Sequence, residues 1–118
     1  MKSEEFTRVS EFFRANRPNC QRVIRMVSLL GNEVRFKILC ALNEGDFCVG
    51  DLAELVEGKH ANVSQQLKML TLAGYLSRRR EDQNIIYHLE DETVRKAIRF
   101  LQDEFATIVH TDQLLTTE

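Results

Sequence analysis

The sequence predicts a single domain of the α+β class, mainly α-helical with one small β-hairpin. Its 118 residues are enough for one compact domain with a buried core, which we place over residues 1–118. One proline and five glycines interrupt the chain, so its apolar residues can follow long helical patterns. Two short extended runs, separated by a polar linker, are typical of a hairpin.

The composition is that of a folded globular protein. Hydrophobic residues make up 43% and charged residues 29% of the chain, which excludes global disorder. No apolar run approaches the roughly 20 residues that span a bilayer, and the acidic Glu4 and Glu5 do not fit a signal peptide. Three cysteines are too few for a disulfide framework. We therefore expect a cytoplasmic protein with reduced thiols and no membrane partner.

Three helices are predicted before residue 45. Gly31 stops the second of them, and Asn32 can cap the third. Apolar residues recur at spacings of three and four in each segment, as on one face of a helix. The predicted segments are Glu4–Asn16, Cys20–Leu30 and a third from Val34 through Leu42 that ends near Gly45.

The N-terminal residues 1–22 contain three of the seven phenylalanines of the chain. Phe6, Phe12 and Phe13 share one face of the first predicted helix. We expect this segment to extend a dimer interface. A pocket between the rings for a small apolar ligand is the alternative.

A helix-turn-helix is predicted over residues 49–73. The segment Val49–Glu57 predicts a short helix closed by Gly58. The segment Ala61–Ala73 predicts a longer helix closed by Gly74. Two helices joined by so short a turn are typical of this motif.

The hairpin is predicted over residues 75–89. Tyr75–Arg80 and Ile85–Leu89 are the extended runs, and Glu81–Asn84 has the polar composition of a hairpin loop. Arg78, Arg79 and Arg80 would then alternate between the two faces of the first strand.

A last helix is predicted over residues 91–109, with Asp91 as its N-cap. Its apolar residues step by four and three, a pattern suited to pairing with another helix. They are Val94, Ile98, Leu101, Phe105 and Ile108. We interpret this seam as a dimer surface.

Charge is distributed unevenly along the chain. The net charge is −2, yet residues 58–80 contain five basic residues and no acidic one. The rest of the chain holds 11 of the 16 basic residues and all 18 acidic ones. A solvated cluster of charge is the simpler explanation for any one lysine. The coincidence of this basic stretch with a helix-turn-helix and a hairpin favours binding to nucleic acid, because phosphate contacts supply affinity.

The second helix of the motif carries the side chains that can read bases. Amides and hydroxyls near the start of such a helix can pair with base edges in the major groove. Asn62, Ser64 and Gln65 are the strongest candidates, and His60 is equally well explained as an exposed turn residue. The full set of candidate DNA-binding residues is Lys59, His60, Asn62, Ser64, Gln65, Gln66, Lys68, Arg78, Arg79 and Arg80.

Several of these segments resemble a known family. Gly31-Asn32-Glu33-Val34-Arg35, the stretch VGDLAELVE, the stretch NVSQQLKMLTLAGYLSRRRE and the stretch IIYHL are similar to the ArsR/SmtB family of winged-helix bacterial transcriptional repressors. The resemblance covers roughly residues 23–109 and makes residues 75–89 the wing. It implies a winged helix-turn-helix that dimerises through its first and last helices. It also implies binding to double-stranded operator DNA and release by an inducer.

The family's inducer sites are not reproduced. Members that sense soft metals carry a Cys-x-Cys pair where this chain has Cys48-Val49-Gly50. The last-helix positions that bind zinc in other members are Asp91, Thr93, Glu104 and Thr107 here, without histidine. We therefore expect no metal site of these kinds and no cofactor.

The cysteines leave one candidate sensor. Cys40 lies in the apolar run ILCAL and is best explained as a core residue. The remaining candidate is a thiol sensor formed by Cys20 and Cys48, within one chain or across the dimer. The alternative is that Cys48 only caps a helix.

Two classes of function compete after these observations. The first is a sequence-specific DNA-binding regulator. The second is a winged-helix protein-interaction module without an inducer site, which the uninterrupted basic stretch disfavours. An enzyme is excluded, because the sequence has no phosphate-binding loop and no recognisable nucleophile and base.

Overall fold

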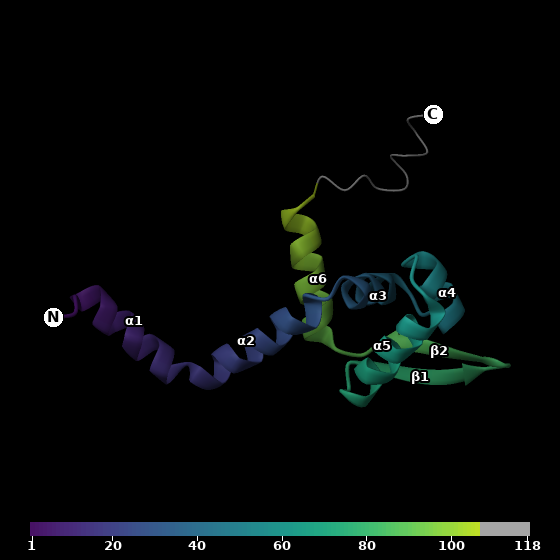
Figure 1. Cartoon of the computed structure of the whole chain (residues 1–118), viewed down its shortest axis with the longest axis horizontal. Coiled ribbons are helices and arrows are strands. Elements are labelled where there is room, and N and C mark those ends of the chain that lie inside the picture. The colour runs from purple at the N-terminus through teal and green to yellow at the C-terminus, as the bar shows by residue number, and fades with distance from the viewer. Residues whose placement is uncertain (107–118) are drawn as a thin grey trace.

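The computed structural model describes residues 1–106 and confirms the predicted α+β architecture. Six helices and one antiparallel pair of strands make up this part of the chain. In order they are α1 (Glu4–Ala15), α2 (Arg17–Leu30), α3 (Glu33–Glu44), α4 (Val49–Leu55), α5 (His60–Leu72), β1 (Leu76–Glu81), β2 (Asn84–Leu89) and α6 (Glu92–Glu104). Helices α3 to α5 and the hairpin form the body, from which α6 rises (Figure 1). Among these residues no helix is long and apolar enough to cross a bilayer.

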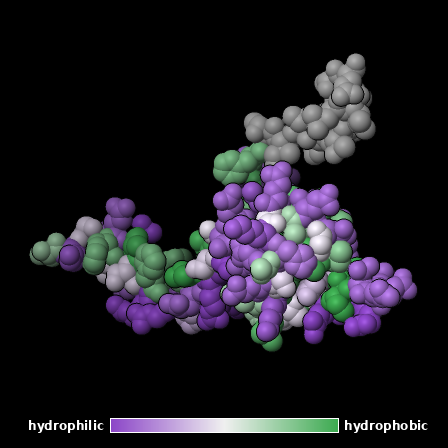
Figure 2. All heavy atoms as spheres, turned by 45° about the vertical axis from the view of Figure 1, so that its right-hand side comes forward, coloured by the Kyte–Doolittle hydropathy of each residue, from purple (hydrophilic) through white to green (hydrophobic). Residues whose placement is uncertain are grey.

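Helices α1 and α2 form an arm that leaves the body (Figure 1). The sequence predicted a second helix starting at Cys20, but α2 begins at Arg17, and Asn16 alone separates it from α1. Pro18 lies in the first turn of α2, where the missing backbone N–H leaves no hydrogen bond unmade. The arm exposes apolar side chains, which appear as green patches along it in Figure 2.

The core lies where α3 to α6 meet the base of the hairpin. Ile38, Leu39 and Leu42 of α3 are fully buried. The other buried side chains are Leu29, Leu52, Val56, Val63, Leu67, Leu70, Leu76, Leu89, Val94 and Ile98. Helix α5 contributes one apolar stripe to this core, so its orientation is fixed while its opposite face stays exposed.

The turn between α4 and α5 confirms the predicted helix-turn-helix. Glu57 has a left-handed backbone with φ of 54°, and the Gly58 N–H donates to the Ala53 carbonyl at 3.0 Å. A Cβ atom at Gly58 would approach methyl groups of Val63 and Val56 at 3.1 and 3.2 Å. The glycine therefore allows the two helices to pack closely.

The hairpin is anchored at its base and free at its tip. Leu76 pairs with Leu89, and both are buried. Asp82 and Gln83 form the two-residue turn, where Asp82 adopts a left-handed backbone with φ of 55° that aspartate tolerates. The tip extends away from the body (Figure 1).

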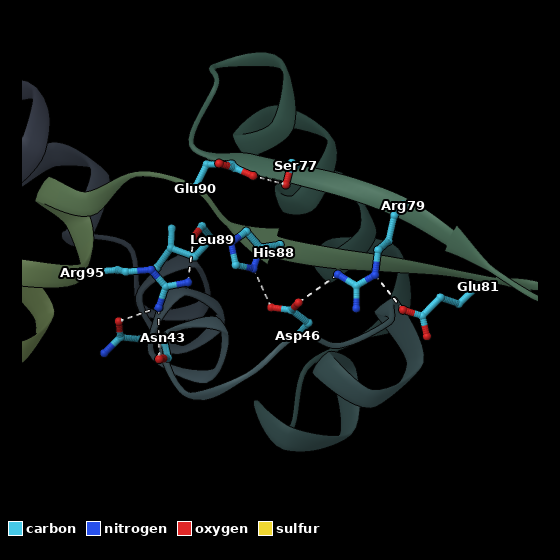
Figure 3. Close-up of polar contacts among 9 residues, drawn as sticks. All are labelled: Asn43, Asp46, Ser77, Arg79, Glu81, His88, Leu89, Glu90 and Arg95. Carbon is cyan, nitrogen blue, oxygen red and sulfur yellow. Dashed lines mark hydrogen bonds and ion pairs between the residues drawn. The ribbon is translucent and has the colours of Figure 1, made fainter.

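Polar contacts attach the hairpin and α6 to the end of α3 (Figure 3). Arg95 of α6 donates to the Leu89 carbonyl at 2.7 Å and to the Asn43 carbonyl at 3.2 Å. Backbone hydrogen bonds of 2.9 and 3.3 Å between Phe47 and Tyr87 join the α3–α4 loop to β2. The base of the wing is therefore fixed to the helix-turn-helix.

Asp46, in the same loop, contacts both strands of the wing (Figure 3). Its Oδ1 lies 2.8 Å from His88 Nδ1, and its Oδ2 accepts from Arg79 Nη1 at 2.9 Å. Hydrogen bonds from Arg79 and then from His88 lower the pKa of Asp46 below its ordinary value. We refer to Asp46, Arg79 and His88 as the wing clasp.

Helix α6 confirms the predicted N-cap, because the Asp91 side chain accepts from the Val94 N–H at 2.9 Å. Val94 and Ile98 are fully buried within the chain's own core, which differs from the predicted dimer seam. The first turns of α6 pack on α3, and the later turns pass beyond the body. The apolar stripe is therefore buried where α6 begins and exposed where it ends. Phe105 is exposed, and Ile108 lies outside the described residues.

Leu67→Ala tests the role of α5 in the core. Leu67 is 0% exposed, so we expect its truncation to lower the free energy of unfolding by about 2–5 kcal/mol. The same change at Leu72, which is 80% exposed, should cost less than about 0.5 kcal/mol. Urea unfolding followed by circular dichroism, at one protein concentration, measures both. Similar losses in the two variants would contradict this packing.

Asp46→Asn tests the wing clasp through pH. Because the folded-state pKa of Asp46 is lowered, its ionised form stabilises the fold above the unfolded-state pKa. That stabilisation disappears as the pH falls through the folded-state value. We therefore expect Asp46→Asn to destabilise the protein at neutral pH and down to about pH 5, and the difference from the unmodified protein to vanish in stronger acid. A difference in unfolding free energy that is independent of pH would refute the assignment.

Candidate nucleic-acid interface

The outer face of α5 presents a row of polar side chains. Asn62, Ser64, Gln65 and Lys68 are all exposed, while Val63, Leu67 and Leu70 of the same helix are buried in the core. Burial on one side therefore aims the polar row at solvent. Amide, hydroxyl and ammonium groups on one exposed helix face can contact base edges and phosphates.

Gln66 differs from its neighbours. The residue is half-buried, and its Oε1 atom is buried without a hydrogen-bond partner among residues 1–106. It lies between the exposed face and the core, so the structure does not bring Gln66 together with the exposed row.

A hollow connects the start of α5 with the wing. Its volume is about 410 Å³. His60 and Ser64 line it on the helix, and Asn84 and Tyr87 line it on β2. His60 is the first residue of α5 and is exposed, and Lys59 is the exposed N-cap. Helix and wing thus border one continuous concave surface.

The three wing arginines are not equivalent. Side chains alternate along a strand, so Arg78 and Arg80 share the face of Leu76, and Arg79 occupies the other face. Within residues 1–106, Arg78 and Arg80 form no ion pair. Arg79 donates to Asp46 at 2.9 Å and, through Nε, to Glu81 at 2.6 Å. These two hydrogen bonds raise the pKa of Arg79, which stays charged but is neutralised locally.

The cysteines are separate free thiols in the described chain. Cys20 lies on the arm, and Cys48 is the N-cap of α4 without a side-chain capping bond. Cys40 packs against the core, and burial, followed by the nearby Glu44 charge, raises its pKa. Its thiolate is therefore scarce at neutral pH, which suits a structural residue.

The described residues hold no cluster of three or more His, Cys, Asp or Glu side chains able to bind a metal. Asp91 serves as a helix cap, and Thr93 and Glu104 are exposed. Thr107 lies outside the described residues.

The wing clasp is the part of this region that sequence reasoning missed. Asp46 lies 33 residues from Arg79 and 42 from His88. Nothing in the local pattern around Asp46 distinguishes it from an ordinary loop aspartate.

Comparison with known proteins agrees with this geometry. Residues 32–78 match the family described as "Bacterial regulatory protein, arsR family". The chain is 34% identical over 94 residues to a cadmium resistance transcriptional regulatory protein, a CadC homolog of Staphylococcus aureus, covering 76% of this chain and 78% of the relative. It is 30% identical over 83 residues to the transcriptional activator HlyU of Vibrio cholerae, covering 70% of this chain and 77% of that protein.

Solved structures show the same fold. The transcriptional repressor BigR from Xylella fastidiosa superposes with a TM-score of 0.71 at 25% identity, over 82% of this chain and 97% of that one. A homodimeric winged helix-turn-helix domain from Mycobacterium bovis gives a TM-score of 0.62 at 25% identity, over 80% and 94% of the two chains. The chain therefore belongs to the ArsR family of bacterial DNA-binding transcriptional regulators, a family that is not enzymatic.

Proposed function

We propose that this protein is a homodimeric repressor that binds double-stranded operator DNA and is released by an inducer. The observation that carries the proposal is the exposed polar row of α5 beside the wing arginines Arg78 and Arg80, which form no ion pair within residues 1–106. Both lie in residues 58–80, a stretch without a single acidic residue. A surface of this charge and shape fits the major groove and its flanking phosphates.

The side chains divide by the part of DNA that they contact. Asn62, Ser64 and Gln65 read base edges, because their amides and hydroxyl can pair there. Phosphate contacts come from the positively charged side chains Lys59, Lys68, Arg78 and Arg80. His60 contacts a phosphate or base at the start of α5, and the half-buried Gln66 is left out of the proposed contacts.

A homodimer is supported by apolar surface that the described chain leaves uncovered. Val23, Ile24 and Val27 of α2 are 54–64% exposed, and Phe100 and Phe105 of α6 are exposed as well. A groove of about 520 Å³ lies between α2 and the first residues of α6. A second copy that packs its own first and last helices here would cover these residues. The Mycobacterium bovis relative is a homodimer.

Repression is favoured over activation because several relatives are named repressors, among them BigR and the SmtB homolog of Synechocystis, whereas HlyU is named an activator. The inducer is proposed to act on thiols, with a thiol-reactive species or a soft metal as the first classes to test. Cys20 and Cys48 are the candidate residues, within one chain or across the dimer. The rival function, a protein-interaction module without an inducer site, does not require a surface free of acidic residues.

Gln65→Ala tests base reading. We expect it to weaken binding to an operator selected from a random duplex pool by about 1–3 kcal/mol, and to leave binding to random duplex unchanged. Lys68→Gln is the matched phosphate variant and should weaken both by similar factors. Fluorescence anisotropy on both duplexes gives the comparison. If Gln65→Ala weakens both duplexes equally, Gln65 does not read bases.

Val27→Glu tests the dimer. A charge placed in an apolar interface loses its hydration, so we expect the variant to sediment as a monomer and to bind operator more weakly. Leu55→Glu is the control, because Leu55 is 57% exposed but lies on α4, away from the proposed interface. Analytical ultracentrifugation measures the mass of each. A dimeric Val27→Glu variant would exclude α2 from the interface.

A further inference from the structure

Three arginines follow one another in β1, and the structure separates them by what they contact. Arg79 alone is held by carboxylates within residues 1–106, from Asp46 on one side and Glu81 on the other (Figure 3). The Asp46 carboxylate is held by two hydrogen bonds. Each of its carboxylate oxygens has its own partner, Arg79 for Oδ2 and His88 for Oδ1. The next residue, Phe47, is bonded through its backbone to Tyr87.

We propose that Asp46 is a positioning residue that fixes the wing to the helix-turn-helix through Arg79 and His88, and thereby withholds Arg79 from DNA phosphates. The inference rests on the proposed DNA binding and deepens it. It makes Asp46 a determinant of specificity although Asp46 itself contacts no DNA.

The charges explain why Arg79 is withheld. Arg79, Asp46 and Glu81 together carry a net charge of −1, so the two carboxylates more than balance the charge of Arg79. Asp46 and Glu81 already accept from two of the five N–H donors of Arg79 at 2.9 and 2.6 Å, so a phosphate could reach only the remaining N–H groups and would approach two carboxylates there. Arg78 and Arg80 face no such competition and supply the phosphate contacts of the wing.

The consequence is a gain in discrimination. A phosphate contact strengthens binding to every DNA sequence, whereas specificity is the difference between operator and random DNA. Asp46 removes one sequence-independent contact. By joining both strands to the α3–α4 loop, it also holds the wing in a fixed position relative to α5.

Asp46→Asn tests the proposal with little change in shape. We expect binding to random duplex to strengthen and the slope of log affinity against log salt to steepen by about 0.9, the value of one additional phosphate contact. The ratio of operator to random affinity should fall. Glu90→Gln is the matched control, since Glu90 accepts a hydrogen bond from Ser77 at 2.6 Å and its change also removes one negative charge beside the hairpin. Its salt slope should match that of the unmodified protein.

Arg79→Gln provides the second arm. In the otherwise unmodified protein it should leave the salt slope unchanged, whereas Arg80→Gln should flatten it by about 0.9. The double variant Asp46→Asn with Arg79→Gln should return to the unmodified slope, because the released guanidinium is absent.

Two results would overturn the inference while leaving DNA binding intact. One is an Arg79→Gln slope as flat as that of Arg80→Gln. The other is an Asp46→Asn slope equal to that of Glu90→Gln. Failure of the unmodified protein to bind either duplex would instead reject the proposed function, and the inference with it. Circular dichroism of each variant separates these outcomes from loss of the fold.

Discussion

The burial of one stripe of α5 is the constraint on which the rest of this structure depends. Val63, Leu67 and Leu70 are locked against the core, so the helix cannot rotate about its axis. The packing of the buried stripe therefore determines that the polar row faces solvent, and no contact made by the polar side chains is needed to hold this orientation. Since Leu76 and Leu89 belong to the same core, the base of the wing has a fixed position relative to that row.

Electrostatics acts on top of this rigid arrangement. Basic residues are frequent on the helix and the wing, yet not every one of them is proposed to contact DNA. A guanidinium that is already held by two carboxylates neutralises little phosphate charge, so few counterions leave the DNA when it binds. In the wing clasp, the α3–α4 loop supplies a carboxylate that holds Arg79, and we propose that this contact withholds Arg79 from DNA. Asp46 is ionised far below neutral pH, so the clasp persists across physiological conditions.

Local rules predicted the helices and strands. The caps at Asn32 and Asp91 follow from residue type and spacing, and the structure has them where expected. The predicted start of α2 at Cys20 was wrong, because a proline in the first turn, here Pro18, is compatible with a helix. The burial of Val94 and Ile98 was not foreseen, since a periodic stripe does not indicate whether it faces its own chain or a partner. The wing clasp joins residues 33 and 42 positions apart, and such pairing depends on the fold as a whole.

The arm gives the strongest physical argument that the described chain is half of the functional unit. Helix α1 has 12 residues and, within the described structure, contributes none to the core. A helix of this length is marginal in water without tertiary packing, and its apolar face is left exposed. A second copy that covers α2 and the end of α6 would supply the missing packing and would set the distance between two α5 helices. Operator binding requires that distance to match about one helical turn of DNA, roughly 34 Å. An inducer that alters packing along the arm can therefore control DNA binding without touching either α5 helix.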